Sequence, residues 1–158
     1  MPPCLDVYVW VNHAGRPVGL KRFIERYVDR DDPGDARLAA FERVHLLEAG
    51  TGDDRESLAE LRRDDASGEE SSLYLHGRHH HSATITLTRE GAVVLGLSLD
   101  DPFNSPDVLA EGTLLLRRLC QEFSATEGLA GVELPPPQSS SEWTQDAEVL
   151  VRLGPTDL

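Results

Sequence analysis

The stretch that decides the fold is 72–100, SLYLHGRHHHSATITLTREGAVVLGLSLD. From Ala83 to Thr88, apolar side chains alternate with threonines, which gives a strand one apolar face and one hydroxyl face. A second apolar row follows, and its members are Val93, Leu95, Leu97 and Leu99. The alternation predicts two neighbouring antiparallel strands that bury one common face.

The turn between these strands decides which side chains face each other. A three-residue loop, Arg89–Gly91, places Leu87 opposite Val93 and keeps the two apolar rows on one face. A two-residue loop would put apolar and hydroxyl side chains on the same face of the sheet. The longer loop needs a left-handed backbone at its last residue, where Gly91 stands. We therefore expect the three-residue loop, within a meander of strands near 73–77, 81–88 and 92–99.

Further segments extend this meander. The segment 5–12 is apolar on both faces, so we expect a strand in the centre of the sheet. Apolar residues at helical spacing predict helices over 18–29 and 106–124, the second capped by Ser105 with Pro106 as its first residue. A final edge strand is expected near 148–153.

The expected fold class is α+β. A single, mostly antiparallel sheet of four or five strands carries helices on one face, with the helix 106–124 on the meander. An acidic helical insertion, 35–63, lies between the first and second strands. Within it, 36–47 is expected as a helix, with a partial strand as the alternative. At 158 residues, the chain is expected to form one domain, 1–158.

The chain is strongly acidic, with a net charge of −13, and the acidity is uneven. Between Asp29 and Glu70 there are 14 acids and 6 arginines, so this stretch alone carries −8. Such a surface aids solubility, and its field also attracts basic partners. Direct nucleic-acid binding is disfavoured because it needs a basic patch.

Other features of the composition concern compartment and redox state. The sequence contains no apolar run of about 20 residues, so neither a membrane span nor a membrane partner is expected. Its first residues lack a basic segment before the apolar run, which argues against a signal peptide. Cys4 and Cys120 do not make a disulfide framework and are expected as reduced thiols. We therefore expect a cytoplasmic protein.

Four of the six histidines gather between positions 76 and 81. His79 and His81 are two residues apart, so on a strand they would share a face and could bind one zinc ion. No third ligand is evident in the sequence, because no H-E-x-x-H or paired C-x-x-C motif is present. The alternative is an exposed, histidine-rich start of a strand, with no cofactor.

The absence of a complete catalytic set favours a non-enzymatic binding function. Acidic loops would steer a basic protein such as a toxin or nuclease, and an exposed tryptophan would anchor it. The residues expected to bind this partner are Asp29, Asp31, Asp32, Asp35, Asp64, Asp65, Glu69, Glu70 and Trp143. In its small size, its acidity and its lack of a complete catalytic set, the chain resembles toxin-immunity proteins. The alternatives are a small-molecule-binding module and a metal-dependent enzyme that uses His79 and His81.

Overall fold

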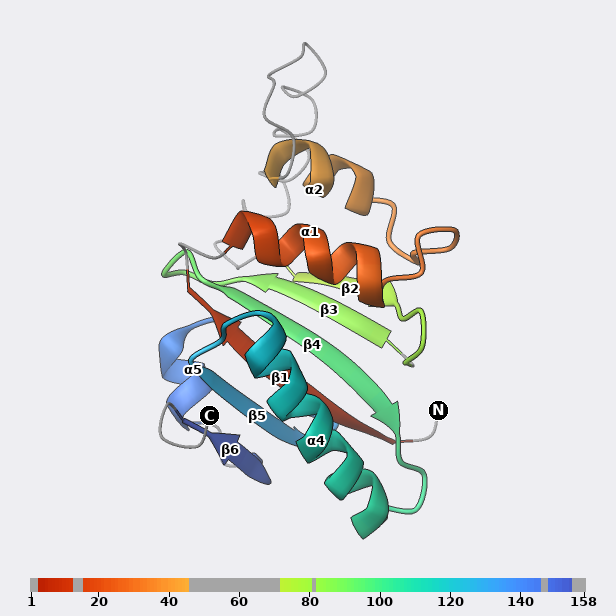
Figure 1. Cartoon of the computed structure of the whole chain (residues 1–158), viewed down its shortest axis with the longest axis vertical. Helices are drawn as coiled ribbons and strands as arrows, with labels where there is room; N and C mark the ends of the chain where they lie inside the picture. Colours follow the sequence, from red (N-terminus) through yellow and green to blue (C-terminus); the bar gives the residue numbers. More distant parts are fainter. Residues whose placement is uncertain (1–2, 13–15, 46–71, 81, 146–147, 155–158) are drawn as a thin grey trace.

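The computed structural model describes residues 3–12, 16–45, 72–80, 82–145 and 148–154. Within these residues, six strands form one antiparallel sheet in the order β2-β3-β4-β1-β5-β6 (Figure 1). In chain order the elements are β1 (Cys4–Val11), α1 (Arg16–Tyr27), α2 (Leu38–His45), β2 (Ser72–His76), β3 (Ser82–Leu87), β4 (Val93–Asp100), α4 (Pro106–Glu122), β5 (Glu127–Val132), α5 (Ser140–Gln145) and β6 (Val151–Leu153). The expected α+β class is confirmed, with more strands than the four or five predicted.

The turn between β3 and β4 has the predicted three-residue loop. Leu87 pairs with Val93, as the register argument requires. Ile85 pairs with Leu95 in the same register. Gly91 adopts a φ of 83°, the left-handed conformation that the last loop residue needs. The apolar rows of the two strands therefore lie on one face.

The strand β1 lies between β4 and β5, which confirms its expected central position. Val7 and Val9 face the larger apolar core. Tyr8 and Trp10 point to the opposite face, where a smaller apolar cluster forms. Both faces of this strand are thus covered, as its two-sided apolar sequence indicates.

The helices α1 and α4 cover one face of the sheet (Figure 1). The start of α4 is as predicted, because the Ser105 side chain accepts a hydrogen bond from the Asp107 N–H. Its expected packing on the meander is wrong: α4 lies mainly over β1 and β5, while α1 lies on the β2–β3 side. Gly112 permits the close approach, since a Cβ there would come within 2.5 Å of Leu5 Cδ2.

A helix also covers part of the opposite face of the sheet, which corrects the expectation of helices on one face only. The short helix α5 packs there through Trp143, whose ring meets Trp10 edge-on with centroids 5.4 Å apart. Ser139 caps α5, because its hydroxyl accepts a hydrogen bond from the Glu142 N–H at 3.2 Å. Residues 133–139 lead the chain from β5 to this helix.

The sequence predicts only a short strand at 132–134 in this region, whereas the structure has a longer strand, β5, which ends at Val132. Its sequence, EGLAGV, contains two glycines, which disfavour a strand on propensity alone. Packing explains both of them. A Cβ on Gly128 would lie 2.7 Å from Leu116 Cδ1, and one on Gly131 would lie 2.8 Å from the Glu148 carbonyl oxygen.

Part of the expected acidic insertion, 35–63, falls within the described residues. There α2 confirms a helix over most of 36–47. The rest of the expected insertion lies outside the described residues. The final edge strand is confirmed as β6, which pairs with β5. In the part of the chain that the structure describes, no helix is both long and apolar enough to span a membrane.

Candidate functional site

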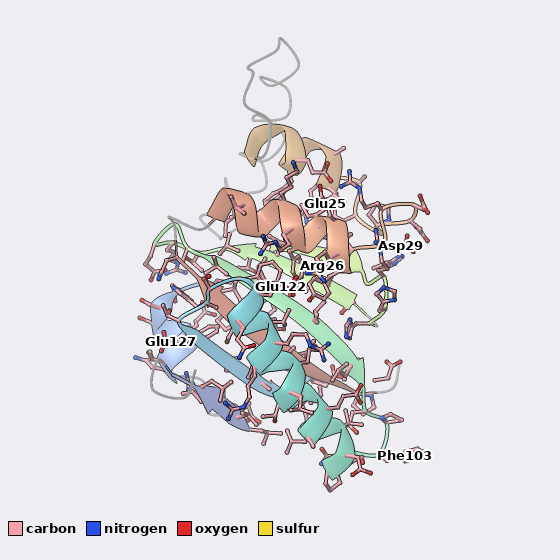
Figure 2. All side chains as sticks on the ribbon, in the orientation of Figure 1. Glu25, Arg26, Asp29, Phe103, Glu122 and Glu127 are labelled. Atoms are coloured by element: carbon pink, nitrogen blue, oxygen red, sulfur yellow. The ribbon has the colours of Figure 1, made fainter. Side chains whose placement is uncertain are left out.

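The acidic turn, residues 29–35, follows α1 and is held by its own side chains (Figure 2). Asp29 Oδ1 accepts hydrogen bonds from the N–H groups of Asp31 at 3.1 Å and Asp32 at 3.3 Å. Asp31 and Asp32 are exposed. The carboxylates of Asp31 and Asp32 therefore lie at the surface, while the carboxylate of Asp29 stabilises the turn.

Asp35 differs from these exposed acids because it forms an ion pair. Its carboxylate accepts a hydrogen bond from Arg37 Nη2 at 2.9 Å. Partial burial by itself would raise the pKa of Asp35, but the hydrogen bonds and charge of Arg37 outweigh it and lower the pKa below its usual value. Asp35 thus holds the turn to Arg37. The other acids expected to bind a partner, Asp64, Asp65, Glu69 and Glu70, lie outside the described residues.

The expected exposure of Trp143 is wrong. Its side chain is 1% exposed and packs against Trp10 and the rest of the smaller apolar cluster. A buried tryptophan cannot anchor a partner without local unfolding. Trp143 is therefore a core residue, and the aromatic side chain that the structure exposes beside a groove is Tyr74.

His79 lies in the connection between β2 and β3, so the strand alternation expected to align it with His81 does not apply. His81 itself lies outside the described residues. Among the described residues, no group of three or more His, Cys, Asp or Glu side chains is placed to hold a metal. His79 instead shares a cleft with Arg78 and Arg118, whose positive charges disfavour a divalent cation.

A groove of about 580 Å³, lined by both polar and apolar residues, lies on the sheet face opposite α1 and α4. We call it the anionic groove and define it by Asp6, Tyr8, Tyr74, Thr84, Ser98 and Glu133. Three register partners on β3, β4 and β1 form a hydrogen-bonded row across it. Ser82 Oγ donates to Ser98 Oγ at 2.8 Å, and Ser98 Oγ donates to Asp6 Oδ1. The residues that line the groove are all described, and none of them is basic.

The next row across the sheet adds hydroxyl and aromatic groups. Tyr8 lies over Gly96, because a Cβ on that glycine would come within 2.5 Å of the tyrosine ring. Thr84 is 6% exposed, and its Oγ1 has no hydrogen-bond partner among the described residues. Tyr74, at the outer end of the row, is 57% exposed. The groove thus combines an unpaired hydroxyl, whose burial costs free energy, with an aromatic ring at its rim.

Glu133 stands where the chain leaves β5 and turns over the groove. Its φ of 50° is in the left-handed region that favours glycine, so the backbone is strained there. The Cys4 N–H donates to Glu133 Oε1 at 2.7 Å, and the Leu134 N–H donates to Asp6 Oδ2 at 2.9 Å. These bonds hold both carboxylates of the groove in place.

The local field in the groove is negative, and two neighbouring groups respond to it. Burial raises the pKa of the Cys4 thiol, and the charges of Asp6, Asp100 and Glu133 raise it further. Burial likewise raises the pKa of Tyr8, with Asp6 and Glu133 adding to the effect. A negative field of this kind disfavours anions and favours cations.

The groove was not predicted from the sequence, because its residues come from β1 to β4 and from the segment after β5. One available signal was the hydroxyl row of β3, in which Thr84 and Ser82 share a face. A hydroxyl face that is buried instead of solvated indicates that something covers or fills it. Pairing of that row with Asp6 could be inferred only from the sheet order.

No protein-family model matches the chain, and a search of curated proteins finds no match. Among solved structures, the chain is similar to Pseudomonas aeruginosa T6SS protein PA0821, with 17% sequence identity and a TM-score of 0.33. The alignment covers 91% of this chain and 46% of that one, so this chain spans less than half of the other protein's length. A similarity of this size shows neither a shared family nor a shared activity.

Proposed function

We propose that this chain is a non-enzymatic, acidic binding protein that masks a basic partner protein, such as a toxin or nuclease, in the cytoplasm. The observation that carries the proposal is the anionic groove, which is lined by the carboxylates of Asp6 and Glu133 and by the exposed ring of Tyr74. A guanidinium or ammonium group suits such a site, because carboxylates accept its N–H bonds and an aromatic face attracts the cation.

The acidic turn extends this surface beyond the groove. The His76 N–H donates to the Pro33 carbonyl at 2.8 Å, and Asp32 Oδ2 lies 3.6 Å from His76 Nδ1. His76 and Tyr74 are two residues apart on β2, so they share a face of the sheet. The exposed acids of the turn and the rim of the groove therefore belong to one continuous surface that a single partner could cover.

The charge of the whole chain supports the same function. A net charge of −13 gives a field that attracts a basic protein and speeds its encounter. Charges at the rim of an interface contribute mainly to association rate and salt dependence, while groups in a groove fix the docked position. We therefore assign steering to Asp31 and Asp32, and docking to the groove.

The test uses the full chain and the product of the neighbouring gene, immobilised on a biosensor. We expect binding that weakens as salt rises, and a loss of about tenfold or more in affinity for the triple variant Asp31→Asn, Asp32→Asn and Glu133→Gln. The matched control changes Asp107, Glu111 and Glu127 to their amides. This control removes the same charge from residues outside the groove and the acidic turn.

Two outcomes would contradict the proposal. One is no binding at low salt. The other is binding that neither salt nor the triple variant changes, since the contact would then not depend on these carboxylates. Equal losses in the triple variant and its control would assign the effect to net charge and remove the docking role of the groove.

A further inference from the structure

A second concave surface lies on the helix face of the sheet. It has a volume of about 830 Å³ and is bounded by the end of α1, the end of α4 and residues 78–80. We call it the arginine–histidine cleft, and its residues of interest are Arg26, Tyr27, Arg78, His80, Arg118 and Glu122. Figure 2 shows Arg26 and Glu122 between the two helices. The cleft is thus separated from the anionic groove by the sheet itself.

The carboxylate of Glu122 is already occupied. One of its oxygens accepts a hydrogen bond from Arg26, with which it forms an ion pair, and the other accepts one from the Tyr27 hydroxyl. Among the described residues, no ion pair within 4.0 Å includes Arg78 or Arg118. In a chain of net charge −13, two guanidinium groups therefore line a single cleft without forming an ion pair, although Glu25 and Glu122 line it as well.

His80 adds a further unsatisfied group to this cleft. Its Nδ1 is buried and has no hydrogen-bond partner among the described residues, and its ring lies 6.3 Å from that of Tyr27. Burial lowers the pKa of His80, and the neighbouring His79 and Arg118 lower it further, against the opposing charge of Glu111. An anion with several oxygens would satisfy the two guanidinium groups.

We propose that the arginine–histidine cleft binds a small phosphate-bearing molecule, with Arg78 and Arg118 holding the phosphate. Guanidinium groups bind phosphate oxygens through paired, charge-assisted hydrogen bonds, which is why arginine predominates at such sites. A cleft of about 830 Å³ is within the range of small-molecule sites, so it has room for more than the phosphate itself. This site lies on the other face from the proposed protein-binding surface and does not depend on it.

The test follows inorganic phosphate binding to the full chain by NMR, at constant ionic strength kept with chloride. We expect saturable shifts in the signals of His80 and a rise in its pKa, because a bound anion favours the imidazolium. Arg118→Gln and Arg78→Gln should each weaken binding about tenfold. The matched control is Arg117→Gln, which removes an exposed arginine from the same helix without touching the cleft.

Three results would overturn the proposal. The first is the absence of saturable binding. The second is an equal loss in Arg117→Gln, which would show that phosphate responds only to the general charge of α4. The third is equal binding of acetate and phosphate, since a site for a carboxylate would not need two arginines. Melting curves of each variant will check that a loss of binding is not a loss of the fold.

Discussion

The two faces of the sheet are built from the same strands but have different compositions. On the helix face, β1 contributes Val7 and Val9 to a large core that is apolar throughout. On the other face, the same strand contributes Trp10 to an apolar cluster and Asp6 to the anionic groove. Because side chains alternate along β1, one set of residues packs in the core and the next set faces the groove. Substitutions at adjacent positions of this strand should therefore differ in whether they lower stability or partner affinity.

The largest effect is expected in the core of the helix face. Phe23 is 0% exposed and meets Phe123 edge-on, so Phe23→Ala should lower the free energy of unfolding by about 3–5 kcal/mol. Val18, on the same helix, is 67% exposed, and Val18→Ala should change the free energy of unfolding by less than about 0.5 kcal/mol. Urea denaturation measures both. A small loss in Phe23→Ala would mean that this face is not the main source of stability.

The polar face should be less sensitive, but it has one tight position. A Cβ on Gly96 would lie 2.3 Å from Thr84 Oγ1 and 2.5 Å from the Tyr8 ring, so Gly96→Ala should cost about 1–3 kcal/mol. Gly19→Ala is the control, because its Cβ would make only ordinary contacts at 3.8 Å and alanine favours the helix. Thermal melts should separate the two. Equal melting temperatures would show that Tyr8 moves freely over β4.

Trp143 distinguishes a core residue from a binding residue on this face. Its Nε1 has no hydrogen-bond partner among the described residues, so Trp143→Phe removes ring volume without breaking a bond. We expect a loss of about 1–2 kcal/mol in stability and unchanged partner affinity. The affinity is measured on the same biosensor as the groove variants. Unchanged stability together with a lower partner affinity would instead indicate that Trp143 anchors the partner.

The smallest expected effect is on the alkylation rate of Cys4, which reports the electric field in the groove and can be measured without a partner protein. Burial raises the pKa of Cys4, the nearby carboxylates raise it further, and both reduce the fraction of reactive thiolate at pH 8. Glu133→Gln removes one of these charges, and the alkylation rate of Cys4 by iodoacetamide should rise about twofold. Glu142→Gln is the control. Cys120, which is buried and whose pKa burial raises to about 11, should react slowly in every variant.

Local signals in the sequence predicted much of the fold. Gly91 determined the turn and register of the β3–β4 hairpin, and Ser105 marked the start of α4. The strand β5 was missed because its glycines are required by packing against Leu116 and Glu148, which propensity does not include. Trp143 was expected to be exposed because its sequence neighbours are polar, but Ser139 caps a short helix there, and this helix packs Trp143 into the smaller apolar cluster.

The candidate sites were harder to predict than the fold. The acidic turn was expected, because its four aspartates lie within seven residues of the sequence. The anionic groove and the arginine–histidine cleft each combine residues from distant segments, such as Asp6 with Glu133 and Arg78 with Arg118. Only the sheet order and the helix packing bring those residues together, and neither follows from the spacing of single motifs.

The central position of β1 has a consequence for how the chain folds. Its first residue, Cys4, contacts Asp100 and Glu133, which are 96 and 129 residues further along the chain. Such long loops are entropically costly to close, so folding should be slow compared with a domain of local contacts. During synthesis, β1 has no strand to pair with until β4 emerges, and the second side of β1 stays open until β5 follows. The strand that contributes Asp6 and Tyr8 to the groove therefore lacks at least one neighbouring strand for most of the synthesis.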